Sequence, residues 1–278
     1  MNWTLRVFAT LALALASSTT LLSAQSDSDR ELNLGTQSYK NAKYEKAIWH
    51  FEKAVALDPE NITARMYLAT AYGSQYIPGV EQSENTVLGE KAIEQYQYVL
   101  NAPQVGDRRL NSAKGIAYLY LNMKKFEDSK KYYLLASDLD PKDPENYYSI
   151  GVLDWTQTYQ PRMEARAKLD LRPEDHLNPN IEAQRMACDD LRGRNMPMIQ
   201  DGIEQLTKAI ELRPDYDDAM AYMNLMYRER ADVECNDLAA REQDLKAADN
   251  WVDKTIAVKK TKDKKVRDLS KPTGSHPE

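Results

Sequence analysis

Apolar and small residues recur at spacings of three and four along most of the chain, which is the period of an amphipathic helix. Near the N-terminus two such stripes predict helices at 32–41 and 44–57, and the second ends before Pro59 because proline lacks an amide proton. The same ending, Ala then Leu then Pro, returns at Ala136–Pro141 and Ala209–Pro214. Alternating Val, Ile and Thr runs, which are typical of strands, are missing from the sequence. The pattern predicts an all-α chain built from a repeated helical hairpin.

The recurring residues resemble the signature of the tetratricopeptide repeat, a helix-turn-helix unit of about 34 residues. The first unit matches at Leu34, Gly35, Tyr44, Ala47, Phe51, Ala54 and Pro59. The later units match at Tyr72, Ala92, Tyr96, Tyr120, Phe126, Tyr133, Ala136, Pro141, Gly151, Ala209, Pro214 and Tyr227. The resemblance implies an α-solenoid, that is, a superhelix of antiparallel helix pairs in which these residues pack the repeats together.

The register predicts a solenoid over 25–258, with a degenerate last unit. Its five units are expected at 28–61, 62–109, 110–143, 144–216 and 217–258. Two units contain long insertions between their helices. The second has a loop around the Pro-Gly turn at Pro78, and the fourth carries an insertion at about 156–197. We expect this longer insertion to hold two short helices, 161–171 and 180–195, which either cover one end of a binding groove or are decoration.

Residues 1–24 have the pattern of a secretory signal cleaved near Ala24. They carry one positive charge, a ten-residue apolar run and a small-residue end. An uncleaved anchor is the alternative, but the apolar run is shorter than the roughly 18 residues that a spanning helix needs. We therefore expect an exported protein of bacterial type, periplasmic or secreted, without a stable membrane anchor.

The segment 259–278 is basic, although the whole chain has a formal net charge of −6. It lacks aromatic residues and an apolar face, so we expect a disordered, solvated tail. Contact with anionic lipid, nucleic acid or an acidic partner is the alternative, and we predict no nucleic-acid partner.

Cys188 and Cys235 are the two cysteines of the chain. An oxidising compartment would allow them to form a disulfide, and buried or free thiols are the competing interpretations.

Members of the tetratricopeptide repeat family bind other proteins on an inner wall formed by the first helix of each unit. Twelve residues are expected to face that wall: Tyr39, Lys40, Met66, Thr70, Lys114, Tyr118, Asn122, Tyr148, Val152, Trp155, Leu225 and Arg228. Such a mixed aromatic and cationic surface suits an extended peptide or a partner helix. For each residue, packing against a neighbouring unit is the alternative. Thr36 and Tyr118 stand where the chaperone-binding members of the family carry Asn, so we do not predict capture of a chaperone tail.

Catalytic patterns are missing from the sequence. His50, His176 and His276 are far apart and lack metal-ligand spacing, and no glycine-rich phosphate loop or nucleophile elbow is present. We expect no enzyme, no cofactor and no metal. The sequence predicts an interaction scaffold for a protein or peptide partner. The alternatives are a self-assembling structural spacer of the cell envelope, made by homo-oligomer contacts, and, less favoured, an envelope enzyme with a site on the insertion 155–200.

Overall fold

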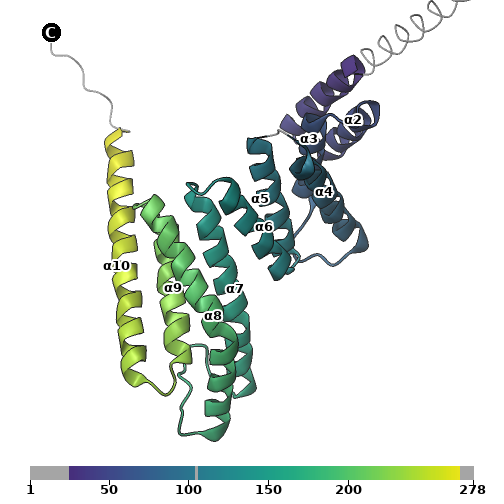
Figure 1. Ribbon diagram of the computed structural model, residues 1–278. Helices are drawn as coiled ribbons and strands as arrows, with labels where there is room; N and C mark the ends of the chain where they lie inside the picture. Colours follow the sequence, from purple (N-terminus) through teal and green to yellow (C-terminus); the bar gives the residue numbers. More distant parts are fainter. Residues whose placement is uncertain (1–24, 104–105, 270–278) are drawn as a thin grey trace, which may run out of the picture. The chain divides into compact units, whose positions relative to one another are not determined.

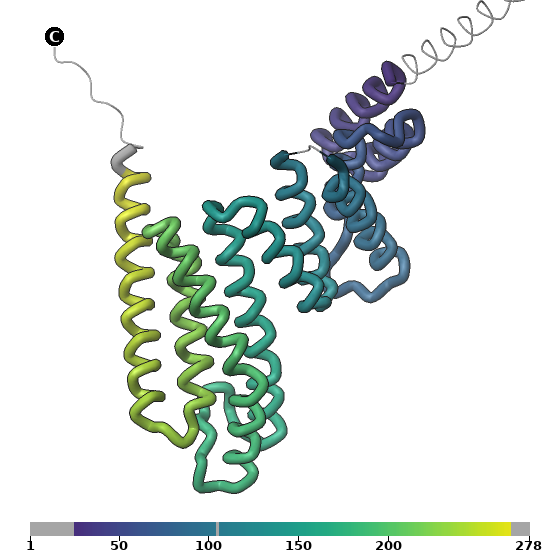
Figure 2. Tube along the Cα trace, viewed as in Figure 1, coloured from purple at the N-terminus to yellow at the C-terminus, as the bar shows by residue number. Residues whose placement is uncertain are grey.

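We describe the fold from a computed structural model, which defines residues 25–103 and 106–269 (Figures 1 and 2). The predicted signal segment 1–24 lies outside these residues, as does 270–278. The described part is helical and contains no strand. Residues 25–40 form the first helix. The following helices are α2 (Tyr44–Leu57), α3 (Ile62–Gln75), α4 (Ser83–Asn101), α5 (Asp107–Asn122), α6 (Phe126–Leu139), α7 (Pro144–Lys168), α8 (Glu182–Leu212), α9 (Asp217–Val233) and α10 (Leu238–Leu269).

The chain forms two compact units, unit 1 (Met1–Tyr132) and unit 2 (Tyr133–Glu278). In unit 1, α2 packs on α3, α3 on α4, and α4 on α5. Phe51 is fully buried there, and Gly35 lies so close to its ring that a Cβ at position 35 would overlap it. Glycine at this repeat position is therefore required by the close approach of the first helix to α2.

Most of the predicted packing residues are buried or half-buried. The buried ones are Gly35, Ala47, Phe51, Ala54, Tyr72, Ala92, Tyr96, Tyr133, Ala136, Gly151 and Ala209. Tyr44, Tyr120, Phe126 and Tyr227 are half-buried, whereas Pro59, Pro141 and Pro214 are exposed in the turns that follow the second helices. Leu34 is an exception on a helix, because its side chain is also exposed.

Short polar contacts fix the turns of unit 1. The side chain of Asn61 caps α3 by accepting a hydrogen bond from the backbone N–H of Ala64 at 3.0 Å. The loop between α3 and α4 is held by Asn85, whose amide donates to the carbonyls of Ile77 and Val80 at 2.9 and 2.7 Å. This loop spans only 76–82, because both flanking helices extend into the segment where a longer loop was expected.

Unit 2 consists of α7 to α10 with the second half of α6. Figure 1 shows α7, α8, α9 and α10 as long neighbouring rods, and each packs on the next. Leu206, Met223 and Met226 are buried in its core. Gly151 allows α7 to approach Leu206 on α8, since a Cβ there would lie 2.5 Å from the leucine Cγ.

The insertion of the fourth repeat differs from the prediction. Residues 161–168 continue α7 and residues 182–195 begin α8, so the two short separate helices that we expected are wrong. The insertion lengthens one helical hairpin, whose connection 169–181 can be followed in Figure 2. Pro161 and Pro197 lie inside these helices without ending them.

The basic C-terminal segment also differs from the prediction where it is described. Residues 259–269 are the end of α10 and are helical, not disordered. Lys262 Nζ lies 2.6 Å from an oxygen of Asp217 on α9, and this contact attaches the segment to unit 2. The hydrogen bond from Lys262 also lowers the pKa of Asp217. Among the described helices, none has both the length and the apolar character needed to cross a membrane.

Candidate functional site

Three of the residues predicted to face the inner wall in unit 1 meet at a cavity between α3, α4 and α5. Its volume is about 360 Å³. It is lined by Thr70, Gly73, Ser74, Tyr76, Tyr96, Gly115, Tyr118 and Leu119. Thr70 and Tyr118 are wall predictions, and Tyr39 reaches the same place by a 2.7 Å hydrogen bond between its hydroxyl and Ser74 Oγ. The structure therefore brings residues of three successive first helices together.

The floor of this cavity depends on Tyr96, which we predicted only as a packing residue. Gly115 on α5 faces its ring, and a Cβ at position 115 would lie 2.7 Å from the ring atom Cε2. Burial raises the pKa of the Tyr96 hydroxyl. The absence of a side chain at Gly115 thus lets the Tyr96 ring lie against the backbone of α5.

Tyr118 is the clearest exposed aromatic side chain at the cavity. It is 54% exposed, although it lies beside the nearly buried Leu119. The next predicted wall residue on α5, Asn122, donates its side-chain amide to the carbonyl of Tyr118 at 2.8 Å. Its own carbonyl accepts a 3.3 Å hydrogen bond from Tyr76. Asn122 therefore supports the wall and uses its side chain within α5.

The other predicted wall residues of unit 1 are less prominent. Lys40 is exposed, whereas Met66 and Lys114 are half-buried. The Met66 sulfur accepts a hydrogen bond from Ser112 Oγ at 3.6 Å, so this methionine contributes to the packing of α3 on α5.

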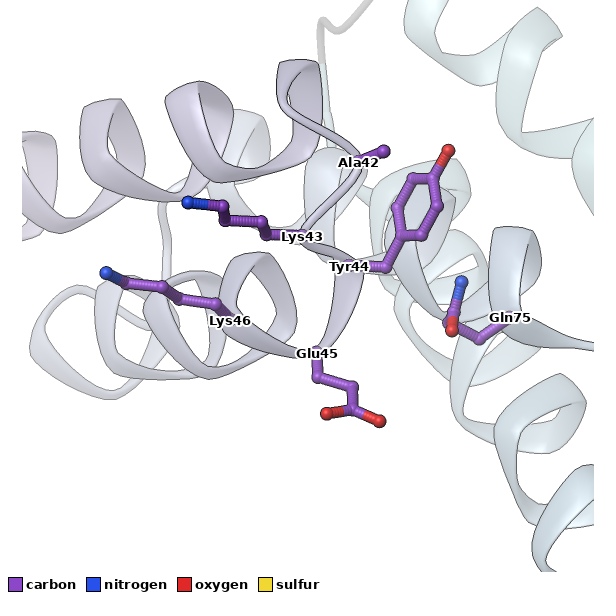
Figure 3. A pocket seen from close by; sticks show the side chains of 6 residues that line it. All are labelled: Ala42, Lys43, Tyr44, Glu45, Lys46 and Gln75. Atoms are coloured by element: carbon purple, nitrogen blue, oxygen red, sulfur yellow. The ribbon is translucent and has the colours of Figure 1, made fainter.

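A second hollow in unit 1 lies where the first helix turns into α2. Its volume is about 430 Å³, and its lining consists of Ala42, Lys43, Tyr44, Glu45, Lys46 and Gln75 (Figure 3). The Tyr44 ring makes an edge contact with Tyr39, with 5.3 Å between ring centroids. In Figure 3 both lysine side chains extend away from Tyr44. The hollow therefore has a tyrosine wall and no convergent charged groups.

In unit 2 the predicted wall residues Tyr148 and Trp155 belong to an aromatic cluster that is partly packed into the core. Tyr222 on α9 lies 5.7 Å from the ring of Tyr148 and 5.4 Å from that of Trp155, measured between centroids. Tyr216 lies 5.0 Å from Tyr148 and donates its hydroxyl to Glu145 at 2.5 Å. Burial raises the pKa of Tyr148 to about 12. Tyr148 and Trp155 therefore stabilise the packing of α7 on α9, in keeping with the alternative that we gave for wall residues.

The remaining wall predictions in unit 2 have similar structural contacts. Val152 and Leu225 are half-buried. Arg228 is exposed, and its guanidinium lies 2.7 Å from a carboxylate oxygen of Asp249 on α10.

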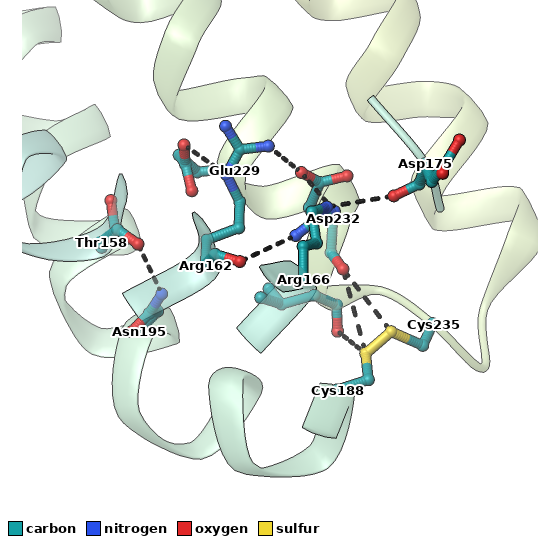
Figure 4. Close-up of polar contacts among 10 residues, drawn as sticks. Thr158, Arg162, Arg166, Asp175, Cys188, Asn195, Glu229, Asp232 and Cys235 are labelled. Carbon is teal, nitrogen blue, oxygen red and sulfur yellow. Dashed lines mark hydrogen bonds and ion pairs between the residues drawn. A yellow bond between two sulfur atoms is a disulfide. The ribbon is translucent and has the colours of Figure 1, made fainter. Parts of the chain in front are cut away.

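A charge network that was not predicted from the sequence fixes the base of the long hairpin (Figure 4). Arg162 on α7 lies 3.1 Å from Glu229 and 2.6 Å from Asp232, both on α9. Arg166, only 1% exposed, lies 3.0 Å from Asp232 and donates to the carbonyl of Asp175 at 3.1 Å. Burial raises the pKa of Glu229 to about 7, against the effect of the neighbouring arginines. Arginines four residues apart on α7 and acids three apart on α9 were the sequence signal for this network.

Cys188 and Cys235 form a disulfide at the same place, with their Cα atoms 6.4 Å apart (Figure 4). The bond joins the start of α8 to the connection between α9 and α10, and both cysteines are buried. The hairpin extension is therefore fastened by one covalent bond and by the charges of Arg162 and Arg166.

The histidines do not form a metal site within the described residues. His50 Nδ1 lies 2.7 Å from Glu31 Oε2 in the core of unit 1, and this hydrogen bond lowers the pKa of Glu31. His176 lies in the 169–181 connection, and burial lowers its pKa. No group of three or more His, Cys, Asp or Glu residues in the described ranges is placed to hold a metal ion. His276 lies outside those ranges.

Residues 115–143 match the family described as Tetratricopeptide repeat. This stretch runs from Gly115 on α5 through α6 to the turn before α7. These residues form a tetratricopeptide repeat. The match confirms the resemblance inferred from the signature residues.

Two solved structures share the tetratricopeptide repeat fold. The structure titled "Crystal structure of MamA protein" is 14% identical, with a TM-score of 0.55 over 90% of this chain and 98% of that one. The structure of YrrB, titled "a TPR protein with an unusual peptide-binding site", is 14% identical, with a TM-score of 0.50 over 82% of this chain and 84% of that one. The predicted all-α solenoid of antiparallel helix pairs is thereby confirmed.

Two curated relatives carry the name "Peroxisomal targeting signal receptor". The Saccharomyces cerevisiae protein is 25% identical over 190 residues, which are 68% of this chain and 29% of the relative. The Eremothecium gossypii protein is 26% identical over 212 residues, which are 73% of this chain and 33% of the relative. The chain thus spans about a third of the length of these relatives.

Proposed function

We propose that this protein is an interaction scaffold that holds a protein or peptide partner at the unit 1 cavity. The exposure of Tyr118 beside that cavity is the observation that carries the proposal. A tyrosine ring left in solvent next to a hollow offers a large apolar area to a partner at little cost in conformational entropy. Aromatic anchors of this kind commonly dominate the binding energy of protein interfaces.

The comparisons support a peptide as the partner class. The curated relatives are named as receptors for a targeting signal, and the YrrB structure is titled with a peptide-binding site. Tetratricopeptide repeat proteins are typically scaffolds and not enzymes, which agrees with a role in binding.

The proposal places the protein in an exported, oxidising compartment. Residues 1–24 have the pattern of a cleaved signal, and Cys188 with Cys235 forms a disulfide of the kind that persists outside reducing compartments. The curated relatives carry a peroxisomal name, and the identity of the mature N-terminus distinguishes export from that location. Mass spectrometry of the protein from its native host should find Gln25 as the first residue, and an N-terminal peptide that retains residues 1–24 would contradict export with cleavage.

The partner site is tested by crosslinking in the native host with a matched pair of variants. Tyr118→Ala removes the exposed ring at the cavity. Trp49→Ala removes a ring of similar exposure, 50%, from the second helix α2. We expect Tyr118→Ala to weaken recovery of the crosslinked partner about tenfold or more, with helicity and melting temperature unchanged. Trp49→Ala should retain the partner.

The outcome of this experiment separates the candidate functions. Equal partner recovery from wild type and Tyr118→Ala would refute the site. Recovery of only a second copy of the chain, with a concentration-dependent mass in light scattering, would replace the scaffold by the self-assembling spacer.

A further inference from the structure

The lining of the unit 1 cavity contains no charged side chain, although 29% of the chain is charged. Three tyrosines, one leucine, two glycines, a threonine and a serine form its wall. Lys40 directly follows Tyr39 in the sequence, and Lys114 directly precedes Gly115. Neither lysine is among the lining residues of the cavity. A charged ligand group would thus lose its hydration in the cavity without gaining an opposite charge.

The hydroxyl protons around the cavity are almost all used inside the protein. Thr70 Oγ1 donates to the carbonyl of Met66 at 2.9 Å, and Ser74 Oγ donates to the carbonyl of Thr70 at 2.8 Å. Each hydroxyl has a single proton, so in the contact between Tyr39 and Ser74 the tyrosine must be the donor.

The hydroxyl protons of Tyr96 and Tyr76 are also used within the protein. In the 3.3 Å contact between Tyr96 and Thr70 the tyrosine is again the donor, because the threonine proton is already used. Tyr76 donates to the carbonyl of Asn122 at 3.3 Å. Among the described hydroxyls at the cavity, that of Tyr118 alone has no hydrogen bond to another described residue.

The cavity therefore offers hydrogen-bond acceptors and aromatic faces, with few donors. A carboxylate or phosphate would find at most the neutral hydroxyl of Tyr118 as a donor there. A ligand group that donates a hydrogen bond through an N–H and has no acceptor atom fits this wall best. Its N–H can donate to a lone pair of a hydroxyl oxygen, and it has no other polar atom that would lack a partner.

We propose, on the basis of the proposed partner site, that the cavity binds the indole ring of a tryptophan in the partner. Lysine, arginine and tryptophan are the side chains that only donate hydrogen bonds, and tryptophan is the uncharged one. Its ring stacks on tyrosine faces and its N–H reaches their oxygens. The volume of about 360 Å³ lies within the range of about 300–1,000 Å³ that is typical of ligand pockets.

Small amides test the chemistry on the full wild-type chain. The probes are N-acetyl-tryptophanamide, its 1-methyl derivative without the indole N–H, N-acetyl-phenylalaninamide and N-acetyl-argininamide. Binding is measured by NMR titration through the backbone amide signals of Gly73 and Gly115, which line the cavity. We expect the tryptophan amide to bind most tightly and its 1-methyl derivative to bind about three- to tenfold more weakly.

The outcomes decide the ligand class. Equal affinity of the tryptophan amide and its 1-methyl derivative would refute the role of the N–H donor. Tighter binding of the arginine amide would show that the tyrosine rings select a cation, which overturns the proposal. Absence of tryptophan binding while partner recovery still depends on Tyr118 would refute the ligand class and leave the scaffold function in place.

A variant on α3 localises the binding without removing a contact of the core. Gly73 lines the cavity, and the nearest atom to a Cβ built there is the Cβ of Ala92 at 4.0 Å. Gly73→Leu should retain the helicity of the wild type and weaken tryptophan-amide binding at least tenfold. Unchanged affinity in a folded Gly73→Leu variant would place the probe elsewhere. If that variant does not fold, Gly73→Ala, whose single methyl has room, serves with a smaller expected loss.

Discussion

Removal of the disulfide between Cys188 and Cys235 should destabilise unit 2 strongly and locally. Both cysteines are buried, so alanine is the appropriate replacement, since serine would bury a hydroxyl as well. The bond closes a loop across a sequence separation of 47 residues. For a loop of that length the chain-entropy relation gives a contribution of about 4 kcal/mol at 25 °C.

The double variant Cys188→Ala/Cys235→Ala should therefore melt roughly 8–16 °C below the oxidised wild type, given the shift of about 2–4 °C per kcal/mol for chains of this size. Thermal unfolding followed by circular dichroism measures the shift. Hydrogen exchange of the 169–181 connection shows whether the loss is local, and exchange there should rise while exchange in α3 stays unchanged.

Reductant provides the matched control. The wild type unfolded and measured in reductant should match the double variant, and the double variant should not respond to reductant at all. Equal melting temperatures and equal exchange of 169–181 in the oxidised wild type and the double variant would refute the reasoning. In that case the charges of Arg162 and Arg166 alone fasten the hairpin.

Two further perturbations test the packing and the buried charges. Gly35→Ala should destabilise unit 1 by about 1–3 kcal/mol in chemical unfolding, because the methyl overlaps the buried ring of Phe51. Gly73→Ala has room for a methyl and should instead stabilise by about 0.5–1 kcal/mol. A change of the same sign in the free energy of unfolding of both variants would contradict the close approach of Gly35 to Phe51. The pKa of Glu229 is about 7 in the fold and 4.5 in the unfolded chain. Between these two pH values the folded state keeps the Glu229 carboxyl protonated more than the unfolded chain does. The free energy of unfolding should therefore fall as the pH rises from about 4.5 to 7. Glu229→Gln should flatten that pH dependence in urea unfolding at constant ionic strength, and an unchanged slope would show that the carboxylate is stabilised in its charged form by Arg162.

The repeat register could be predicted from the sequence because it depends on local periodicity and on a few size constraints. Gly35 against Phe51, and Gly151 against Leu206, are pairs in which a small residue at a fixed offset admits a large one. Such pairs can be recognised from the sequence alone, because the small and the large residue recur at fixed positions of the repeat. The choice of helical face for Thr70 and Tyr118 follows from the same register, and both residues lie at the unit 1 cavity.

Contacts between residues far apart in the sequence could not be predicted in the same way. Tyr148 and Trp155 on α7 contact Tyr222 on α9, and this contact depends on how the two helices cross. Likewise, Arg162 on the extended part of α7 pairs with Glu229, which is 67 positions away and becomes its neighbour only in the folded chain.

For the basic segment 259–269 the prediction from the sequence was wrong for a different reason. Its composition is that of a solvated segment, and composition alone predicts disorder for 259–269. The contact of Lys262 with Asp217 joins this part of the chain to α9, so tertiary contacts override the local tendency.

The order of the two cysteines along the chain has a consequence for biogenesis. Cys235 is synthesised 47 residues after Cys188, and it lies in the turn that ends α9. The covalent closure of unit 2 therefore cannot form before α7, α8 and α9 have all been synthesised. Oxidation then joins the start of α8 to the turn after α9, two segments that meet only in the folded hairpin.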